Sequence, residues 1–168
     1  MANPIYIWFE GVTQGKIEGW GSWKGEDDQT GREGSSLVQA FEHEITIPRD
    51  SQSGMASGTR VHKPIKITKR IDKASPKLYK ALCTGERLKT VEVKWFRINQ
   101  SGGGMQEHYF TTKLEEAVIV SMNQWFPITA DPTKRDYSHL EEVQLTYRKI
   151  IWTWVDGGIE AEDDWKVV

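Results

Sequence analysis

Polar and apolar residues alternate near the C-terminal end of the chain in a pattern that predicts a long, bent strand. Between residues 140 and 154 the alternation has period two, which is typical of a half-buried strand. The apolar positions change parity once, from Val143, Leu145 and Tyr147 on one face to Ile150, Trp152 and Trp154 on the other. A β-bulge near Arg148 re-aims side chains in this way, and such bends occur where a curved sheet closes. The pattern therefore predicts a β-barrel.

Similar β-rich runs recur along the chain, and turn residues separate them. They lie at residues 4–9, 37–47, 61–68, 90–98, 107–112 and 116–122. The glycine-rich segment 101–104 between two of these runs predicts a hairpin connection. No internal repeat and no linker divides the chain, so we expect residues 1–168 to form a single domain.

One helix is predicted, at residues 76–84. Ser75 and Pro76 suit its start, because a serine can cap the free N–H groups and proline is tolerated at the first helical position. Gly85 suits its end. Four residues form its apolar side: Leu78, Tyr79, Leu82 and Cys83. A helix this short is unstable alone, so we expect this side to dock on the barrel and to bury Cys83.

The longest segment without predicted regular structure is residues 48–59, which Ser, Gly and Asp dominate. Such a loop in a compact domain is either an interaction element or a mobile connection, and the residues leave both interpretations open. The residues that would make contacts in the first case are Arg49, Asp50, Ser51, Gln52, Ser53, Gly54, Met55, Ala56 and Ser57.

Composition excludes several classes of protein. The 22 basic and 24 acidic residues nearly cancel, which argues against a general nucleic-acid binder because neutralising phosphates requires a basic excess. The single cysteine rules out an intrachain disulfide framework, and it fits either a reducing cytoplasm or the export of a fold that does not rely on oxidation. We expect no cleavable signal peptide and no membrane insertion, since no basic start precedes a long apolar run and nothing approaches the roughly 20 apolar residues of a membrane span.

The chain shows no signature of catalysis. Its four histidines lack the spacing of a metal site: His43, His62, His108 and His139. The acidic pairs are adjacent in sequence, so on a strand they point to opposite faces and cannot converge like glycosidase carboxylates. No nucleophile elbow and no phosphate-binding loop is present in the sequence. We therefore expect no enzyme activity, no metal and no cofactor.

A basic run follows the extended loop and continues into the helix. Its residues are Lys63, Lys66, Lys69, Arg70, Lys73, Lys77 and Lys80. Such a run can follow a nucleic-acid backbone, but only Tyr79 lies within it, whereas single-strand binders interleave several stacking aromatics. We therefore interpret the run as a charged edge that could face acidic residues of a neighbouring chain, such as Glu115 and Glu116.

The chain resembles the Hcp family, the hemolysin-coregulated proteins that form the tail tube of type VI secretion systems. The resemblance rests on PIYIW at 4–8, GTRVHKP at 58–64, TKRID at 68–72, SPKLYKA at 75–81, and HLEEV at 139–143 continuing to WTW at 152–154. The segments KWFRIN at 94–99 and YFTTKLE at 109–115 are also similar to the hairpin of the family.

The resemblance implies a mainly β fold, with a barrel of two curved, mostly antiparallel sheets, a lateral helix at residues 76–84 and an extended loop at 48–59. It implies a homohexameric ring, and rings that stack into a hollow tube inside a contractile sheath built on a baseplate. The tube would leave the bacterial cytoplasm with a VgrG-type spike, without a cleavable signal peptide, and could carry small effector proteins in its lumen. The loop at 48–59 would contact the neighbouring subunit or ring.

The resemblance also assigns roles to charged residues. It places the strand-like run 37–47 in the sheet that lines the lumen, where Glu42 and Glu44 share one face, so we expect these two to face the lumen. The expected charged interface consists of Lys63, Lys66, Lys69 and Arg70. Because a closed barrel leaves few free strand edges, we expect rings to join through side chains and the loop, with no main-chain ladder along residues 140–155.

Two other functions compete with the tube. A monomeric barrel could bind a small ligand or saccharide through Trp20, Trp23 and Trp125, which lie among glycines and polar residues. An RNA-binding barrel could use the basic run. Native mass separates the tube from the first alternative, and a steep salt dependence of RNA affinity would mark the second.

Overall fold

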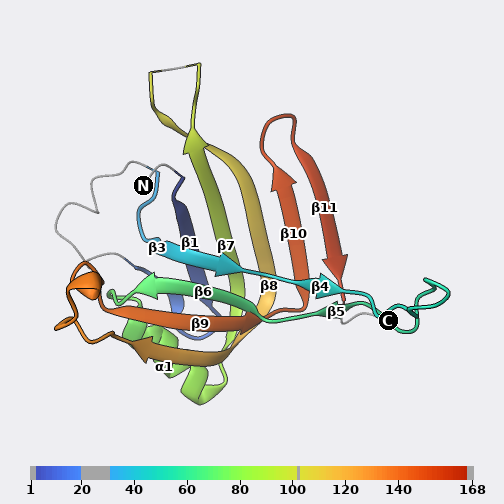
Figure 1. Cartoon of the computed structure of the whole chain (residues 1–168), viewed down its shortest axis with the longest axis horizontal. Helices are drawn as coiled ribbons and strands as arrows, with labels where there is room; N and C mark the ends of the chain where they lie inside the picture. Colours follow the sequence, from blue (N-terminus) through green and yellow to red (C-terminus); the bar gives the residue numbers. More distant parts are fainter. Residues whose placement is uncertain (1–2, 20–30, 102, 166–168) are drawn as a thin grey trace.

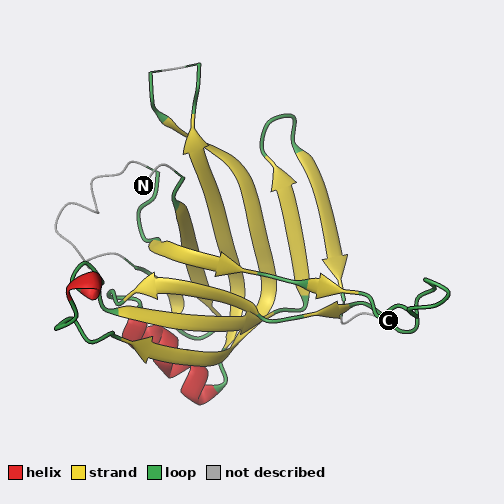
Figure 2. Ribbon diagram, viewed as in Figure 1, coloured by secondary structure: helices red, strands yellow, loops and turns green. Residues whose placement is uncertain are grey.

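A nine-stranded sheet, antiparallel at every recorded pairing, makes up most of the molecule (Figures 1 and 2). The computed structural model describes residues 3–19, 31–101 and 103–165. The strands of this sheet are β1 (Ile5–Gly11), β2 (Gly15–Ile17), β3 (Ser36–Glu42), β6 (Ile65–Arg70), β7 (Arg87–Ile98), β8 (Gln106–Trp125), β9 (Leu140–Thr146), β10 (Lys149–Trp154) and β11 (Ile159–Asp164). A second sheet consists of β4 (Ile45–Thr46) and β5 (Val61–His62).

Six of these strands close into a barrel, as the sequence predicts. Their order is β8-β7-β1-β3-β6-β9, and β9 pairs back onto β8. The hairpin of β10 and β11 extends the sheet from β8 outside this closed path. In Figure 1 this hairpin and the β7–β8 hairpin rise beyond the level at which β3 crosses the molecule.

The predicted single bent strand at residues 140–154 is wrong, because the chain leaves the sheet at Tyr147 and Arg148 and forms β9 and β10 instead. The change of parity is confirmed, since Val143, Leu145 and Tyr147 are buried and Ile150 is buried after them. The strand that serves two walls is β8, whose 20 residues join the two predicted runs 107–112 and 116–122. Its first half pairs with β7 and β10, and its second half pairs with β9.

The bend of β8 lies opposite the break between β9 and β10. Glu116 has a positive φ of 51°, which re-aims the strand at this point. The backbone N–H of Arg148 donates to the carbonyl of Glu115 at 3.2 Å, and the guanidinium of Arg148 contacts the Glu116 carboxylate at 3.0 Å. This corner lets β8 leave one wall of the barrel and enter the other.

The sequence prediction missed β2 and β11. The first has only three residues, and the second reads Ile-Glu-Ala-Glu-Asp-Asp, in which Ile159 is the one β-branched residue and four of the six residues are acidic. Pairing with β10 holds β11 in the sheet in spite of this composition.

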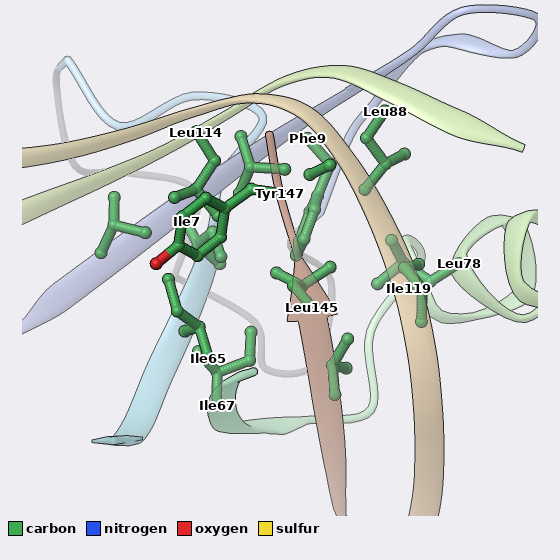
Figure 3. Close-up of a cluster of buried hydrophobic side chains, with 14 of the residues drawn as sticks. Ile7, Phe9, Ile65, Ile67, Leu78, Leu88, Leu114, Ile119, Leu145 and Tyr147 are labelled. Carbon is green, nitrogen blue, oxygen red and sulfur yellow. The ribbon is translucent and has the colours of Figure 1, made fainter. Parts of the chain in front are cut away.

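Buried hydrophobic residues from eight strands and the helix fill the barrel (Figure 3). Ile7, Phe9, Ile65, Ile67, Leu88, Leu114, Ile119, Leu145 and Tyr147 are among the residues of this cluster. Each fully buried side chain of this size stabilises the fold by about 1.5–3 kcal/mol relative to exposure. The predicted period-two runs at 61–68 and 90–98 supply several of these positions.

The helix α1 (Ser75–Thr84) packs against β8 and contributes Leu78 and Ala81 to the core. The prediction that Ser75 caps the helix is wrong: the capping position is Ala74, whose side chain makes no cap, and the carboxylate of Asp72 accepts the N–H of Ala74 at 3.0 Å. The prediction that Cys83 is buried is also wrong, because it lies on the solvent side of the last turn. A short 3₁₀ helix, η2 (Pro132–Lys134), was not predicted.

The end of α1 offers a stability test. Gly85 adopts the left-handed conformation at φ 69°, and its N–H bonds the last carbonyls of the helix. Nothing lies within 4 Å of an added Cβ, so Gly85→Ala introduces only backbone strain. We expect a loss of about 1–2 kcal/mol in the free energy of unfolding, measured by urea denaturation. Gly15→Ala is the matched comparison, because Gly15, the first residue of β2, is equally left-handed; it should lose a similar amount of stability. No loss at either site would contradict this account.

Candidate functional site

The extended loop forms a self-contained hairpin that projects from one end of the molecule (Figure 1). The N–H of Asp50 donates to the carbonyl of Met55 at 2.8 Å, and that of Ser57 donates to the carbonyl of Pro48 at 2.8 Å. The carboxylate of Asp50 also accepts the backbone N–H groups of Ser53 and Gln52, and these bonds lower its pKa. All nine residues predicted for contacts, 49–57, are exposed, and Met55 is 71 % exposed. The loop is therefore ordered by its own hydrogen bonds and free to meet another surface.

Bulging in β3 changes the face to which its residues point. Val38 pairs with Lys69 and Ala40 pairs with Thr68, so the register shifts by one residue between them. Val38 is consequently buried in the core while Ala40 and Glu42 are exposed. Regular alternation along the predicted run 37–47 would place Val38 on the same face as Glu42, and the bulge prevents this.

The two predicted lumen residues are both exposed, at the end of β3 and just beyond it. Glu42 lies opposite Lys66 of the neighbouring strand β6, and together with Glu142 they border a shallow hollow of 240 Å³. Glu44 forms an ion pair with Lys63 at 2.9 Å. The outer face of β3, β6 and β9 is thus a polar surface on which charges of both signs alternate.

The predicted basic run does not form a continuous cationic stripe. Lys63 and Lys66 are paired with Glu44 and Glu142 at 2.9 and 3.1 Å. Arg70 is half-buried at the end of β6, where its backbone lies opposite Leu140 of β9. Lys73, Lys77 and Lys80 are exposed, but the pairing of Lys63 and Lys66 interrupts the run as a continuous cationic surface, which disfavours the RNA-binding alternative.

The prediction that Lys69 belongs to a charged interface is wrong, because its side chain is fully buried. Its ammonium contacts the Glu141 carboxylate at 2.6 Å and the Asp72 carboxylate at 2.9 Å. The hydroxyl of Ser75 donates to Glu141 at 2.6 Å, and the hydroxyl of Ser36 donates to Asp72 at 2.6 Å. This buried network joins β3, β6, β9 and the start of α1.

One apolar row crosses five strands of the sheet on the face that also carries the core. Residues paired across an antiparallel sheet share a face, and the pairings align Ile5, Trp95, Phe110, Trp154 and Ile159. The far end of this apolar row is open, with Trp154 38 % and Ile159 68 % exposed. The guanidinium of Arg97 stacks above Trp154 and Tyr109. Sequence reasoning placed Trp154 in the barrel wall and missed Ile159, which only the pairing of β11 brings to the row.

A second exposed apolar surface lies between β8 and β9, which we call the aromatic patch. It consists of Trp125, Phe126, Ile128 and Tyr137, which are 45 to 76 % exposed. The rings of Trp125 and Tyr137 meet edge to face at 5.6 Å. In Figure 1 η2, in the connection from β8 to β9, lies at the end of the long axis opposite the extended loop. Trp20 and Trp23, which the ligand-binding alternative needs together with Trp125, fall outside the described residues.

The histidines lie against partners inside the chain. His43 and His62 both contact the hydroxyl of Tyr147, His108 contacts the Thr111 hydroxyl at 2.7 Å, and His139 packs on the Phe126 ring. Across residues 3–19, 31–101 and 103–165, no group of three His, Cys, Asp or Glu side chains could hold a metal ion. Over the same residues, no helix has the length and apolar character that crossing a membrane requires.

Comparison with known proteins agrees with the fold described above. Residues 6–154 match the family model "Type VI secretion system effector, Hcp". The major exported protein of Pseudomonas aeruginosa is 47 % identical over 99 % of this chain and 97 % of its own length. A crystal structure of an Hcp protein superposes with a TM-score of 0.89 at 41 % identity, covering 99 % of this chain and all of that one. The secreted protein Hcp3 from Pseudomonas aeruginosa superposes with a TM-score of 0.78 at 41 % identity, over 98 % of this chain and 99 % of that one.

The family match at residues 6–154 covers nearly all of the six barrel strands and the whole extended loop, and the similarity over 99 % of the chain extends beyond it to β11. Because both the sequence and the fold agree over nearly the whole chain, this protein belongs to the Hcp family and is a tail-tube component of a type VI secretion system.

Proposed function

We propose that the chain assembles into a hexameric ring whose copies stack into the hollow tail tube. The observation that carries this proposal is the presence of two different exposed apolar surfaces, the open end of the apolar row and the aromatic patch. Exposed apolar surfaces of this kind mark sites of protein association. Two unlike surfaces on one chain fit the head-to-tail contacts that close a ring, because such contacts join different faces of successive copies.

Side chains, rather than strand pairing, make the ring contacts in this proposal. β9 pairs with β6 and β8, and β10 pairs with β8 and β11, so residues 140–154 have no free edge for a partner strand. In the described part of the chain β10 is the one strand paired with β11, and Glu160, Glu162 and Asp164 give the strand a negative charge that discourages pairing with a second copy. The extended loop, exposed along its whole length, provides the contact with the next subunit or ring.

Membership of the Hcp family supports the remaining partners in this proposal. The stacked rings lie inside a contractile sheath on a baseplate, leave the cell with a VgrG-type spike, and carry small effector proteins in the lumen. The chain acts through self-assembly and has no catalytic role. It is assembled in the bacterial cytoplasm and is exported without a cleavable signal peptide.

Native mass spectrometry of the purified chain tests this proposal. A mass six times that of one chain is expected, because the exposed apolar surfaces favour association over the monomer. A stable monomer at high concentration would instead favour the ligand-binding barrel. RNA affinity that falls steeply with salt would favour the RNA-binding barrel.

Glu42 provides a test of the lumen. In the proposed ring the polar outer face of β3, β6 and β9 lines the lumen, so Glu42→Arg replaces a negative charge by a positive one on each of the six copies. We expect the variant still to form rings. It should retain basic cargo about tenfold less well, which corresponds to a loss of about 1.4 kcal/mol in the free energy of cargo binding. Co-purification of acidic and basic cargo proteins measures the effect. Unchanged retention of every cargo by intact rings would remove Glu42 from the lumen.

A further inference from the structure

The extended loop stands on a narrow base. Residues 48–57 make their recorded hydrogen bonds within their own segment, and the strands that carry the loop, β4 and β5, pair over only two residues each. These strands form a sheet of their own and do not join the ladder of the barrel. The orientation of the loop therefore depends on the side chains at its base.

A chain of hydrogen bonds fixes this base to the barrel and to β11. The hydroxyl of Tyr147, between β9 and β10, contacts Nε2 of His43 at 2.7 Å and Nδ1 of His62 at 2.6 Å. Nε2 of His62 contacts the Asp163 carboxylate of β11 at 2.7 Å, and Arg60 contacts the same carboxylate oxygen at 2.6 Å. The His62 side chain is 1 % exposed. Its ring stacks on Trp165, and the indole N–H of Trp165 donates to the carbonyl of Tyr147 at 2.6 Å.

The number of protons on the two histidines decides whether this chain of hydrogen bonds is complete. With both imidazoles neutral, His43 donates to the Tyr147 oxygen, the Tyr147 hydroxyl donates to Nδ1 of His62, and Nε2 of His62 donates to Asp163. One added proton on His62 is tolerated, because the Tyr147 hydroxyl can then turn and donate to His43. With both histidines charged, two N–H donors face one hydroxyl, whose own proton has no acceptor within the chain of hydrogen bonds.

The charges around the two histidines also disfavour the state in which both carry a proton. The charged groups that face the histidines are Arg60 and Asp163, which contact each other, and Asp164, which contacts Arg148. The exposed pair of Lys63 and Glu44 lies on the adjoining strands. Arg148 also contacts the Glu116 carboxylate, so two guanidinium groups face three carboxylates. One imidazolium balances the remaining negative charge, and a second adds an unmatched positive charge.

We propose that His43, Tyr147, His62 and Asp163 form an acid-sensitive lock, which ties the base of the extended loop to β11 and to the barrel and opens when both histidines carry protons. Burial and the neighbouring His62 lower the pKa of His43 below its usual 6.5. A base with a lowered pKa contributes its stability above 6.5 and loses it as the pH falls toward the lowered value. The hydrogen bond from Arg60 lowers the pKa of Asp163 below its usual 3.8, so the carboxylate still holds its partners while His43 titrates.

The lock has a consequence for assembly that rests on the proposed function. In the stacked tube the loop contacts the next subunit or ring, so its release in acid would separate copies that are joined at neutral pH. The opening itself is a property of one chain and needs no ring.

Hydrogen exchange followed by nuclear magnetic resonance tests the lock. The reporter is the backbone N–H of Lys63, which donates to the carbonyl of Glu44 at 3.1 Å at the base of the loop, and the internal control is Val93 in β7. Between about pH 7.5 and about pH 4.5 we expect the protection factor of Lys63, corrected for intrinsic exchange, to fall about tenfold or more, and that of Val93 to stay constant.

Two variants make the test specific. Glutamine at position 43 can donate to or accept from Tyr147 and never charges, so His43→Gln is expected to keep its Lys63 protection at the lower pH. Tyr147→Phe keeps the ring but removes the hydroxyl, so its Lys63 protection should be low at both values. A constant Lys63 protection in the natural chain, or an equal acid loss in His43→Gln, would overturn the lock. Native mass recorded on the same samples separates the lock from the ring. A monomer whose Lys63 protection falls in acid supports the lock and rejects the ring. Rings whose Lys63 protection stays constant support the ring and reject the lock.

Discussion

Replacing Lys69 with methionine is expected to lower the free energy of unfolding by about 3–5 kcal/mol, the usual cost of removing one partner from a buried ion pair. The substitution leaves two buried carboxylates, those of Glu141 and Asp72, without the ammonium that lies 2.6 and 2.9 Å from them. The side chain of Glu141 is fully buried, so water cannot replace this partner. Urea denaturation of the two proteins measures the difference.

Lys66→Met is the matched control for this experiment. Lys66 lies on the same strand and pairs with Glu142 at 3.1 Å, but its side chain is 42 % exposed. Exposed pairs contribute about 0–1 kcal/mol, so this variant should remain close to the natural chain. Adding Glu141→Gln to Lys69→Met should recover part of the loss, because it removes the unmatched charge. Equal losses for Lys66→Met and Lys69→Met would show that the buried network does not have the role described here.

Ile159→Lys is expected to convert the ring into monomers. The Ile159 side chain is 68 % exposed at the open end of the apolar row, so the substitution is tolerated in one chain but places a charge in the proposed contact. Removing a central apolar contact costs about 2 kcal/mol or more per interface, a factor of about 30 in affinity, and each ring contains this interface in every copy. Size-exclusion chromatography with light scattering measures the mass.

Glu160→Lys is the control, because Glu160 is the next residue of β11 and points to the opposite face of the sheet. It carries the same new charge and leaves the apolar row intact, so the ring should survive. Loss of the ring in Glu160→Lys alone would place the contact on the other face. Circular dichroism of both variants should match that of the natural chain.

The barrel could be predicted from the sequence because its strands carry their burial pattern locally. The parity change between Tyr147 and Ile150 reveals the corner, and the helix shows its end through Gly85. The break at Tyr147 and Arg148 could not be predicted, because a bulge and a two-residue gap produce the same change of parity. The distinction depends on the bend at Glu116 in the strand opposite.

The surfaces were harder to predict, since they depend on which strands become neighbours. Lys69 sits in a run of exposed lysines, and only the approach of Glu141 and Asp72 makes a buried position tolerable for it. The bulge between Val38 and Ala40 leaves no periodic signal that distinguishes it from regular alternation. His43 and His62 lie far from Tyr147 and Asp163 in the sequence, so the chain of hydrogen bonds that joins them is a property of the tertiary fold.

Electron microscopy of the purified natural chain is the most direct test of the central claim that this protein is built to assemble into a tube. The account predicts annular particles with six-fold symmetry and a central hole, in which the polar outer face of β3, β6 and β9 surrounds the hole. The apolar row and the aromatic patch of successive copies should be buried in the contacts between them. Monomeric particles at high concentration, or rings joined by main-chain pairing along residues 140–154, would contradict it.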